Sequence, residues 1–167
     1  MTLVRRALAA LAGATALVLL PAGPALAAGP PPSAMASLGD SITRGFNACG
    51  WYVDCTSRSF STGGDAAVNS HYLRIRAVNP SIQGRNFNDA KTGARSADMY
   101  GQAGTAVSQG VDYVTMLIGA NDACTSSEST MTPVATFRAN IDSALNRIRA
   151  GLPNARVAVI SIPDIHR

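Results

Sequence analysis

Apolar residues fall into short continuous runs that are separated by segments with a helical repeat. Four runs predict β-strands, at residues 34–38, 82–87, 111–118 and 156–162. Three segments predict helices, at residues 66–78, 94–108 and from Pro133 to a stop at Gly151 and Pro153. The last two strands are apolar almost throughout, which is typical of strands buried on both faces. Strands that alternate with helices in this way predict a parallel sheet with helices on both faces.

The helix that starts at Pro133 has the clearest signals. Thr132 can act as its N-cap, and proline is favoured at a first helical position. Its apolar stripe has steps of four, four and three residues, at Phe137, Ile141, Leu145 and Ile148. This spacing gives the helix one apolar face to pack against the sheet.

Four segments follow the carboxyl ends of the predicted strands, at 39–41, 88–93, 119–122 and 163–167. In open parallel sheets, ligands bind beyond these ends, so the candidate chemistry is expected there. The stretch 45–64 is rich in glycine, asparagine and serine and predicts a long loop after the first strand.

The start of the chain has the pattern of a secretory signal peptide. Arg5 and Arg6 precede an apolar run at 7–20, and Ala25-Leu26-Ala27 fits the small-residue cleavage pattern. The run is short for a bilayer crossing; an uncleaved anchor and twin-arginine export are the alternatives. The predicted organisation is a signal peptide at 1–27, a proline-rich linker at 28–33 and one domain at 34–167. We expect a secreted protein, with no stable membrane insertion after the leader is removed.

The amino-acid composition and the net charge limit the classes of protein to which this chain can belong. The 167 residues are 47% hydrophobic and 14% charged, which excludes an intrinsically disordered chain. The formal net charge is +4, and without Arg5 and Arg6 the chain carries 12 basic and 10 acidic residues. Because the basic residues are scattered, we expect no nucleic-acid partner. The oligomeric state is not predicted.

Three cysteines, Cys49, Cys55 and Cys124, suit an oxidising compartment. Five residues separate Cys49 from Cys55, which predicts a local disulfide that fixes a surface loop. Cys124 is then left over, and a partner beyond Arg167 would account for it.

Three short motifs stand at the ends of successive predicted strands: Gly39-Asp40-Ser41, Asn88-x-Ala90-x-x-Gly93 and Gly119-x-Asn121-Asp122. Each motif alone is also typical of an ordinary turn, helix cap or polar loop. Their order changes this interpretation, because the carboxyl ends of parallel strands lie at one edge of a sheet.

Together the three motifs resemble those of the SGNH, or GDSL-type, hydrolases, a family of esterases and lipases. The resemblance runs from about residue 35 to residue 122, and the strand at 156–162 also suits the family's sheet. Secreted actinobacterial esterases look most similar. The resemblance implies a three-layer α/β/α flavodoxin-like fold, which here would lack its last strand and helix.

By the same resemblance, Ser41 is the nucleophile that forms an acyl-enzyme. The oxyanion would be bound by the backbone N–H of Ser41, the backbone N–H of Gly93 and the side-chain amide of Asn121. Asp40 and Asp122 are expected to orient the loops. The sequence has no Gly-x-Ser-x-Gly elbow, no phosphate-binding glycine loop and no zinc-type His/Cys spacing, so no metal or organic cofactor is expected.

The family's general base belongs to an Asp-x-x-His block on a loop after a fifth strand. His71 falls in a predicted helix, while Asp164-Ile165-His166 has one intervening residue and follows the fourth strand. We expect neither histidine to be the base, and the simplest explanation is a chain that continues past Arg167. On that view this chain alone has little esterase activity and exposes an apolar sheet edge.

The sequence therefore predicts a secreted hydrolase of carboxylic esters, whose substrate is a lipid, an acylated sugar or a small acyl ester. The alternative from another class is a non-catalytic secreted flavodoxin-like binding module. A nucleotide-binding domain is disfavoured by the leader and by the absence of a phosphate loop. Trp51 and Tyr52, inside the Cys49–Cys55 loop, are expected to pack within it, and lining an acyl site is the alternative.

Overall fold

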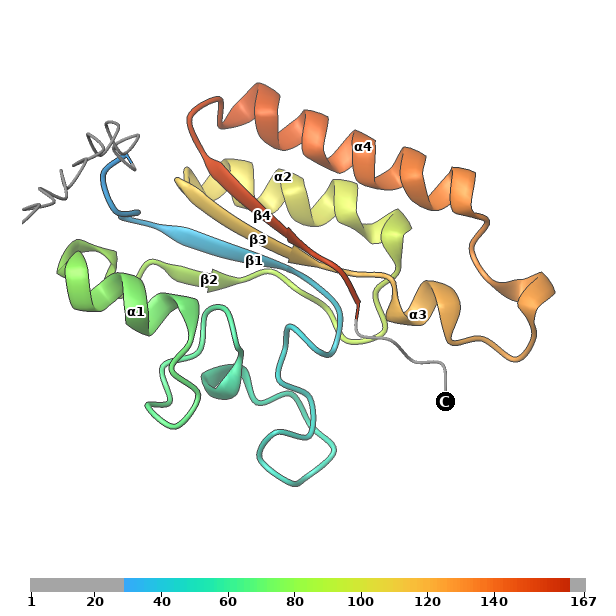
Figure 1. Ribbon diagram of the computed structural model, residues 1–167, viewed down its shortest axis with the longest axis horizontal. Coiled ribbons are helices and arrows are strands. Elements are labelled where there is room, and N and C mark those ends of the chain that lie inside the picture. The colour runs from blue at the N-terminus through green and yellow to red at the C-terminus, as the bar shows by residue number, and fades with distance from the viewer. Residues whose placement is uncertain (1–28, 163–167) are drawn as a thin grey trace, which may run out of the picture.

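Four parallel strands form one sheet in the order β2-β1-β3-β4 (Figure 1). The strands are β1 (Met35–Gly39), β2 (Asn86–Asn88), β3 (Tyr113–Leu117) and β4 (Arg156–Ile160). This computed structural model describes residues 29–162, so the predicted leader and the Asp164/His166 segment lie outside the described residues. The strand order is that of a flavodoxin-like sheet and confirms the predicted parallel arrangement.

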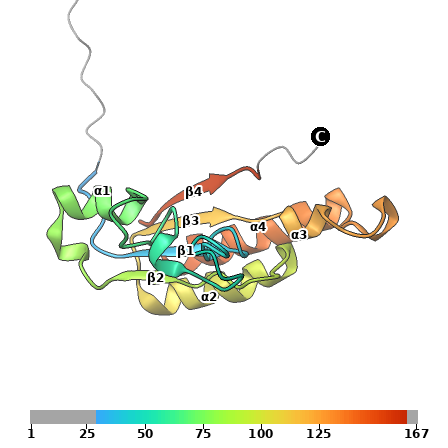
Figure 2. The same cartoon turned by 90° about the horizontal axis from the view of Figure 1, so that it is seen from below.

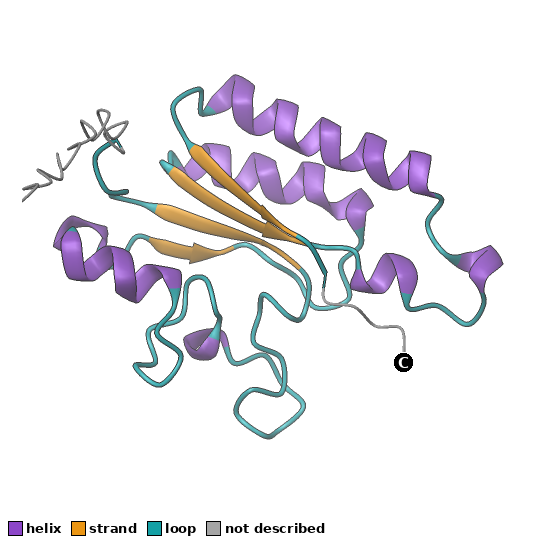
Figure 3. Cartoon of the chain, in the orientation of Figure 1, coloured by secondary structure: helices purple, strands orange, loops and turns teal. Residues whose placement is uncertain are grey.

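Helices cover both faces of the sheet, as the alternation of strands and helices predicted. The helices are α1 (His71–Val78), α2 (Met99–Gln109), α3 (Ala120–Ala123) and α4 (Val134–Gly151). Figure 2 shows α2 running beneath the sheet. Short 3₁₀ turns lie in the connections, at Thr56–Arg58, Pro80–Ile82, Ser96–Asp98 and Glu128–Thr130 (Figure 3).

The main hydrophobic core lies between the sheet and the helices α2 and α4. Its strand residues alternate along β1 and β3 and are fully buried: Ala36, Leu38, Val114 and Met116. The predicted apolar stripe of α4 packs on the same core, and Ile148 near its end is buried. On the opposite face, Tyr72 of α1 packs with Met35 and Ile82. Each face of the sheet is therefore held by helices on its own side.

The first helix and the second strand both start later than the sequence pattern predicted. α1 begins at His71, not at residue 66, because Asp65 accepts the N–H of Ala67 in a separate turn. Ser70 is the helix N-cap, and its hydroxyl accepts the N–H of Leu73 at 3.2 Å. β2 begins at Asn86, not at residue 82, because the N–H groups of Gln83 and Arg85 donate to the carbonyls of Pro80 and Ile82 in consecutive turns.

Smaller corrections concern the two helices that cover the main core. The segment predicted as one helix at 94–108 is a 3₁₀ turn followed by α2, and the Asp98 side chain accepts the N–H of Arg95 at that turn. α4 begins at Val134 with Pro133 as its N-cap, one residue later than predicted. Both differences lie at helix ends, where cap contacts decide the boundary.

The fourth strand is not buried on both faces, so this part of the sequence prediction is wrong. Val157 is 36% exposed and Val159 is 57% exposed. In the register they lie next to Val114 and Met116, which are fully buried. Within residues 29–162, β4 pairs with β3 on one side and forms the edge of the sheet.

Candidate active site

The three sequence motifs meet at the carboxyl edge of the sheet. In the strand register Gly39 lies opposite Leu117, and Ser37 lies opposite Asn88. The backbone N–H of Lys91 donates to the carbonyl of Gly39 at 3.1 Å. The loops that follow β1, β2 and β3 therefore come together, as expected for neighbouring parallel strands.

The segment 39–46, here called the nucleophile turn, has a backbone that requires glycine at its start. Gly39 has a φ of +150°, and a Cβ at this position would collide with the carbonyl oxygen of Leu117. A carboxylate oxygen of Asp40 then accepts the N–H of Ile42 at 2.9 Å, which turns the chain sharply around Ser41. Asp40 thus orients this turn, in line with the role expected for it.

Ser41 is partly buried, and its backbone N–H donates to no acceptor in the described part of the chain. The neighbouring carboxyl of Asp40 is buried, and one of its oxygens, Oδ2, has no hydrogen-bond partner among the described residues. Burial raises the pKa of Asp40, although the hydrogen bond from Ile42 opposes this effect. At the start of the turn, the N–H of Ser41, which has no acceptor among the described residues, therefore lies next to the buried carboxyl of Asp40.

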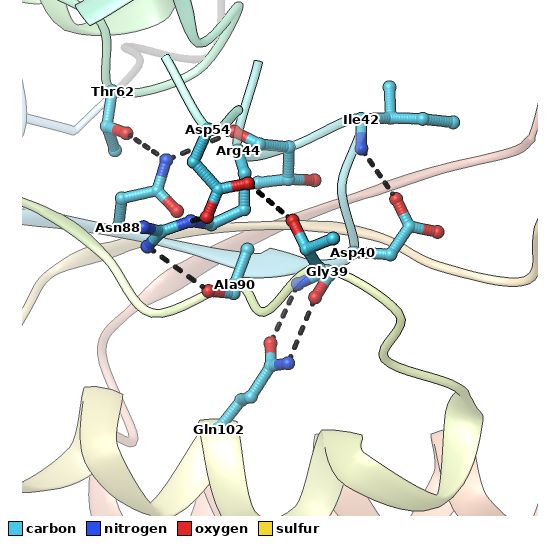
Figure 4. Close-up of polar contacts among 11 residues, drawn as sticks. Gly39, Asp40, Ile42, Arg44, Asp54, Thr62, Asn88, Ala90 and Gln102 are labelled. Carbon is cyan, nitrogen blue, oxygen red and sulfur yellow. Dashed lines mark hydrogen bonds and ion pairs between the residues drawn. The ribbon is translucent and has the colours of Figure 1, made fainter. Parts of the chain in front are cut away.

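Gln102 holds the nucleophile turn from below and was not predicted from the sequence. The side-chain oxygen of Gln102 accepts the N–H of Gly39 at 2.7 Å, and its amide donates to the carbonyl of Gly39 at 3.0 Å (Figure 4). Gln102 is buried on α2, between Met99 and Ala106 on the face that packs against the sheet. A polar residue at a core-facing helical position was the signal that could have found it.

The segment 90–94, here called the glycine loop, carries the second predicted site residue. Gly93 has a φ of +83°, which other residues rarely adopt. The N–H of Ala94 donates to the carbonyl of Lys91 and closes a turn around Gly93. The N–H of Gly93 itself donates to no acceptor within residues 29–162.

Asn121 lies on α3 and contacts the glycine loop directly. Its amide donates one hydrogen bond to the carbonyl of Ala94 at 2.9 Å. An amide has two hydrogens, and no described residue accepts the second one. Asn121 and the glycine loop are thereby fixed to each other.

Asp122 has the orienting role that was expected for it. Its two carboxylate oxygens accept the backbone N–H and the hydroxyl of Ser96, at 2.9 and 2.7 Å. The amide of Asn140 on α4 donates to the same hydroxyl at 3.0 Å. This network joins α3 to the 3₁₀ turn that precedes α2 and to α4, and it holds the residue next to Asn121.

His71 lies at the wrong end of the sheet to serve Ser41. Its Nδ1 is 2.8 Å from the hydroxyl of Tyr113, and the two rings stack with centroids 6.0 Å apart. Tyr113 is the first residue of β3, whereas Ser41 follows the carboxyl end of the neighbouring parallel strand β1. Burial, followed by the charge of Arg74, lowers the pKa of His71. His71 therefore packs against Tyr113 and is not in position to act on Ser41.

The disulfide loop (residues 47–55) lies beside this edge of the sheet. Cys49 and Cys55 form the predicted disulfide, and Cys124 is exposed with no disulfide partner among the described residues. Trp51 is 79% exposed and Tyr52 is 78% exposed. The expectation that these two aromatic side chains pack within the loop is therefore wrong, because a loop this short has no interior to receive them.

A family model described as GDSL-like Lipase/Acylhydrolase matches residues 35–166, a span that includes all three motifs. The chain belongs to this family. Among curated proteins, this GDSL-like chain is similar to the membrane-associated phospholipase B1 of Rattus norvegicus. The two are 30% identical over 164 residues, which cover 77% of this chain and 11% of that protein.

Two solved esterase structures resemble the fold of this GDSL-like chain. A family two carbohydrate esterase from Clostridium thermocellum, in complex with cellohexaose, matches 85% of this chain and 47% of its own, with a TM-score of 0.56 and 18% identity. The acetyl xylan esterase Axe2-W215I from Geobacillus stearothermophilus matches 75% of this chain and 57% of its own, with a TM-score of 0.50 and 17% identity. The chain thus spans 11% of the phospholipase and 47% and 57% of the two esterases. At these identities the structural likeness shows the fold alone.

Two further features describe this GDSL-like domain. Among residues 29–162 there is no group of three or more His, Cys, Asp or Glu side chains that could hold a metal ion. In the same part of the chain, every helix is too short or too polar to cross a membrane.

Proposed function

We propose that the protein hydrolyses carboxylic esters through an acyl-enzyme at Ser41. The observation that carries this proposal is a set of three N–H donors, on adjoining segments, that have no acceptor among residues 29–162. They are the N–H of Ser41, the N–H of Gly93 and the second amide hydrogen of Asn121. Fixed donors of this kind stabilise the negative charge that develops on a carbonyl oxygen during acyl transfer.

In the proposed reaction the Ser41 hydroxyl attacks the ester carbonyl carbon while a general base takes the hydroxyl proton. The carbonyl oxygen becomes an oxyanion and is bound by the donors of Ser41, Gly93 and Asn121. The tetrahedral intermediate then expels the alcohol, which receives the proton from the base. Water attacks the acyl-enzyme in the same way and releases the acid. Gln102 and Asp122 support these steps by holding the two sides of the site in place.

The general base is proposed to lie outside residues 29–162. A base must lie within hydrogen-bonding reach of the serine hydroxyl, directly or through one water. His71 is the one histidine of the described chain, and its contact is with Tyr113 at the far end of β3. We propose that the histidine of an Asp-x-x-His block outside the described residues is the base, and the alternative is the Asp164/His166 pair acting out of register.

We further propose a secreted enzyme whose substrate is a lipid, an acylated sugar or a small acyl ester. The leader pattern and the Cys49–Cys55 disulfide both support export to an oxidising compartment. The similar proteins include a phospholipase, a carbohydrate esterase and an acetyl xylan esterase. Phospholipids and acetylated polysaccharides are therefore the first substrates to compare.

The test is hydrolysis of p-nitrophenyl acetate by the protein expressed from its own complete gene. We expect Ser41→Ala to lower the rate by at least about a thousandfold, because the nucleophile is lost. Ser108→Ala is the control and should leave the rate unchanged, because Ser108 is exposed on α2 and its hydroxyl donates only to the carbonyl of Gly104 in the same helix. A rate that is the same in Ser41→Ala and wild type would contradict the proposal, and a folded wild type without turnover would favour a binding module.

A further inference from the structure

One carboxylate on the disulfide loop contacts both sides of the candidate site. Asp54 Oδ2 forms an ion pair with Arg44 Nε at 2.8 Å, and Asp54 Oδ1 accepts the hydroxyl of Thr92 at 2.5 Å. Arg44 Nη1 also approaches the carbonyl of Ala90 at 3.4 Å (Figure 4). Arg44 belongs to the nucleophile turn, whereas Ala90 and Thr92 belong to the glycine loop. Asp54 therefore joins three separate segments of the chain.

The contact with Thr92 bears directly on the orientation of the Gly93 N–H. The carbonyl of Thr92 and the N–H of Gly93 belong to the same planar peptide unit, so the position of Thr92 helps to set the direction of that N–H. The flanks of the glycine loop are held elsewhere, by the Lys91 N–H on Gly39 and by Asn121 on the carbonyl of Ala94. The hydroxyl of Thr92 adds an anchor at the residue immediately before Gly93.

Asp54 is itself held firmly enough to act as an anchor. The next residue, Cys55, is bonded to Cys49, and the N–H of Asn47 donates to the carbonyl of Val53 at 3.0 Å. The hydrogen bond from Thr92, together with the contact with Arg44, lowers the pKa of Asp54 despite some burial. The carboxylate is therefore ionised at neutral pH, as the ion pair with Arg44 requires.

A second ion pair, in the segment that follows the disulfide loop, provides a natural comparison. Arg58 Nε lies 2.8 Å from Asp65 Oδ2, the same distance as in the Arg44–Asp54 pair. The other oxygen of Asp65 accepts the N–H of Ala67 within its own turn, and none of its described contacts reaches the glycine loop. The two ion pairs thus have the same residue types and the same distance, but only the Arg44–Asp54 pair contacts the glycine loop.

We propose that Asp54 is a positioning residue for ester hydrolysis, which fixes the N–H of Gly93 relative to Ser41 by holding Thr92 against Arg44. This inference rests on the proposed function, since Gly93 matters only if an oxyanion forms there. Asp54 acts through Thr92 and Arg44 and need not touch the substrate.

The first test compares Asp54→Ala with Asp65→Ala in the hydrolysis of p-nitrophenyl acetate. We expect Asp54→Ala to lower kcat by about ten- to a hundredfold with little change in KM, because a displaced donor weakens transition-state binding. Asp65→Ala should leave kcat within about twofold of wild type. Thr92→Val should reproduce the effect of Asp54→Ala, whereas Thr92→Ser, which keeps the hydroxyl, should retain most of kcat. The double variant Asp54→Ala/Thr92→Val should be no slower than the slower single variant, because both remove one interaction.

The second test needs no activity and separates this inference from the proposed function. Amide hydrogen exchange of peptides that span residues 90–94 should be faster in Asp54→Ala than in wild type and unchanged in Asp65→Ala. Equal exchange and equal kcat in the two variants would overturn the role of Asp54 while leaving the nucleophile intact. If wild type shows no Ser41-dependent turnover, the proposed function fails, and the positioning role fails with it even if the exchange result shows that Asp54 orders the loop.

Discussion

The centre of the sheet and its β4 side are built in different ways. β1 is buried along its whole length, and its last residue, Gly39, is fixed by Gln102 and Lys91 through three hydrogen bonds. On the β4 side, Val157 and Val159 are exposed. Beside β4 lies an apolar groove of about 620 Å³, which α4 also lines. Hydrogen bonds to its backbone thus hold the carboxyl end of β1, whereas the β4 side exposes apolar surface.

The candidate site belongs almost entirely to the first region. The nucleophile turn, the glycine loop and Asn121 are held by contacts among β1, the loop after β2, α2 and α3. Gly119 and Asp122 are shared, because they also line the groove beside β4. From this difference we expect the geometry of the proposed oxyanion donors to depend on the centre of the sheet and to tolerate change at its edge.

The largest effect is expected at Gly39. Gly39→Ala should lower the free energy of unfolding by about 4 kcal/mol, because it combines an unfavourable φ with a collision against backbone. Gly101→Ala is the control, since Gly101 lies in α2 with open space around it, and it should be neutral or stabilising by up to about 1 kcal/mol. Urea unfolding of both variants measures the difference, and similar midpoints would contradict the close packing at the end of β1.

Loss of the amide at position 121 should be the next largest effect. Asn121→Asp keeps the shape of the side chain and removes its donors, so kcat should fall by about a hundred- to a thousandfold. Circular dichroism and the urea midpoint should establish that the variant is folded, because Asn121 also holds the carbonyl of Ala94. A folded Asn121→Asp protein with unchanged kcat would exclude this side chain from the oxyanion site.

Removal of the Gln102 amide tests how the centre of the sheet is fixed. Gln102→Leu should lower the free energy of unfolding by about 1–3 kcal/mol, because the buried N–H of Gly39 loses its partner. Gln83→Leu, at an exposed position, is the control and should change stability by less than about 0.5 kcal/mol. If the two variants unfold at the same urea concentration, the contact with Gly39 contributes no net stability.

The pH dependence of stability tests the amino end of β1. Burial raises the pKa of Asp112, but hydrogen bonds from Ser33 and Ala34 outweigh it and leave the pKa below its ordinary value. A lowered pKa in the folded state stabilises the fold above the unfolded value of about 3.9 and loses this effect as the pH falls through the folded value. Asp112→Asn should therefore cost about 1 kcal/mol at pH 7, and the cost should shrink below about pH 4. A cost that does not change with pH would contradict the role of the charge.

The smallest effect is expected at the edge strand. Val159→Thr should change the free energy of unfolding by less than about 0.5 kcal/mol, because Val159 is largely exposed. Its neighbour in the register, Met116, is fully buried, and Met116→Ala should cost about 2–5 kcal/mol. A large cost at Val159 would mean that the β4 side is covered in solution.

The sequence predicted the parts of the fold that depend on apolar periodicity. The stripe of α4 and the buried strand β3 appear where expected, since burial on a regular repeat is a local signal. The start of α1 at His71 was missed, because it depends on the side chains of Asp65 and Ser70 acting as caps. The apolar pattern of β4 predicted burial on both faces, which is wrong, whereas the expectation of an exposed apolar sheet edge agrees with the exposure of Val159.

The candidate site residues were predicted from sequence motifs. Motifs identify residues in short patterns and miss residues that lie outside such patterns. Ser41, Gly93 and Asn121 stand in short recognisable patterns after strands, so their proximity followed from the sheet topology. Gln102 and Asp54 stand in no such pattern, because each is defined by a contact with a residue distant in the sequence. Residues that support a site in this way are recognised by their contacts in three dimensions, so the structure is needed to identify them.

The most direct measurement of the central claim is the position of a covalent fluorophosphonate adduct. The protein expressed from its complete gene would be labelled, digested and analysed by peptide mass spectrometry. The account predicts one adduct on Ser41, absent from Ser41→Ala and from protein unfolded in urea, because reaction needs the folded oxyanion site and a base. A folded protein that carries no adduct, or carries it on a different residue, would contradict the assignment of Ser41 as the nucleophile.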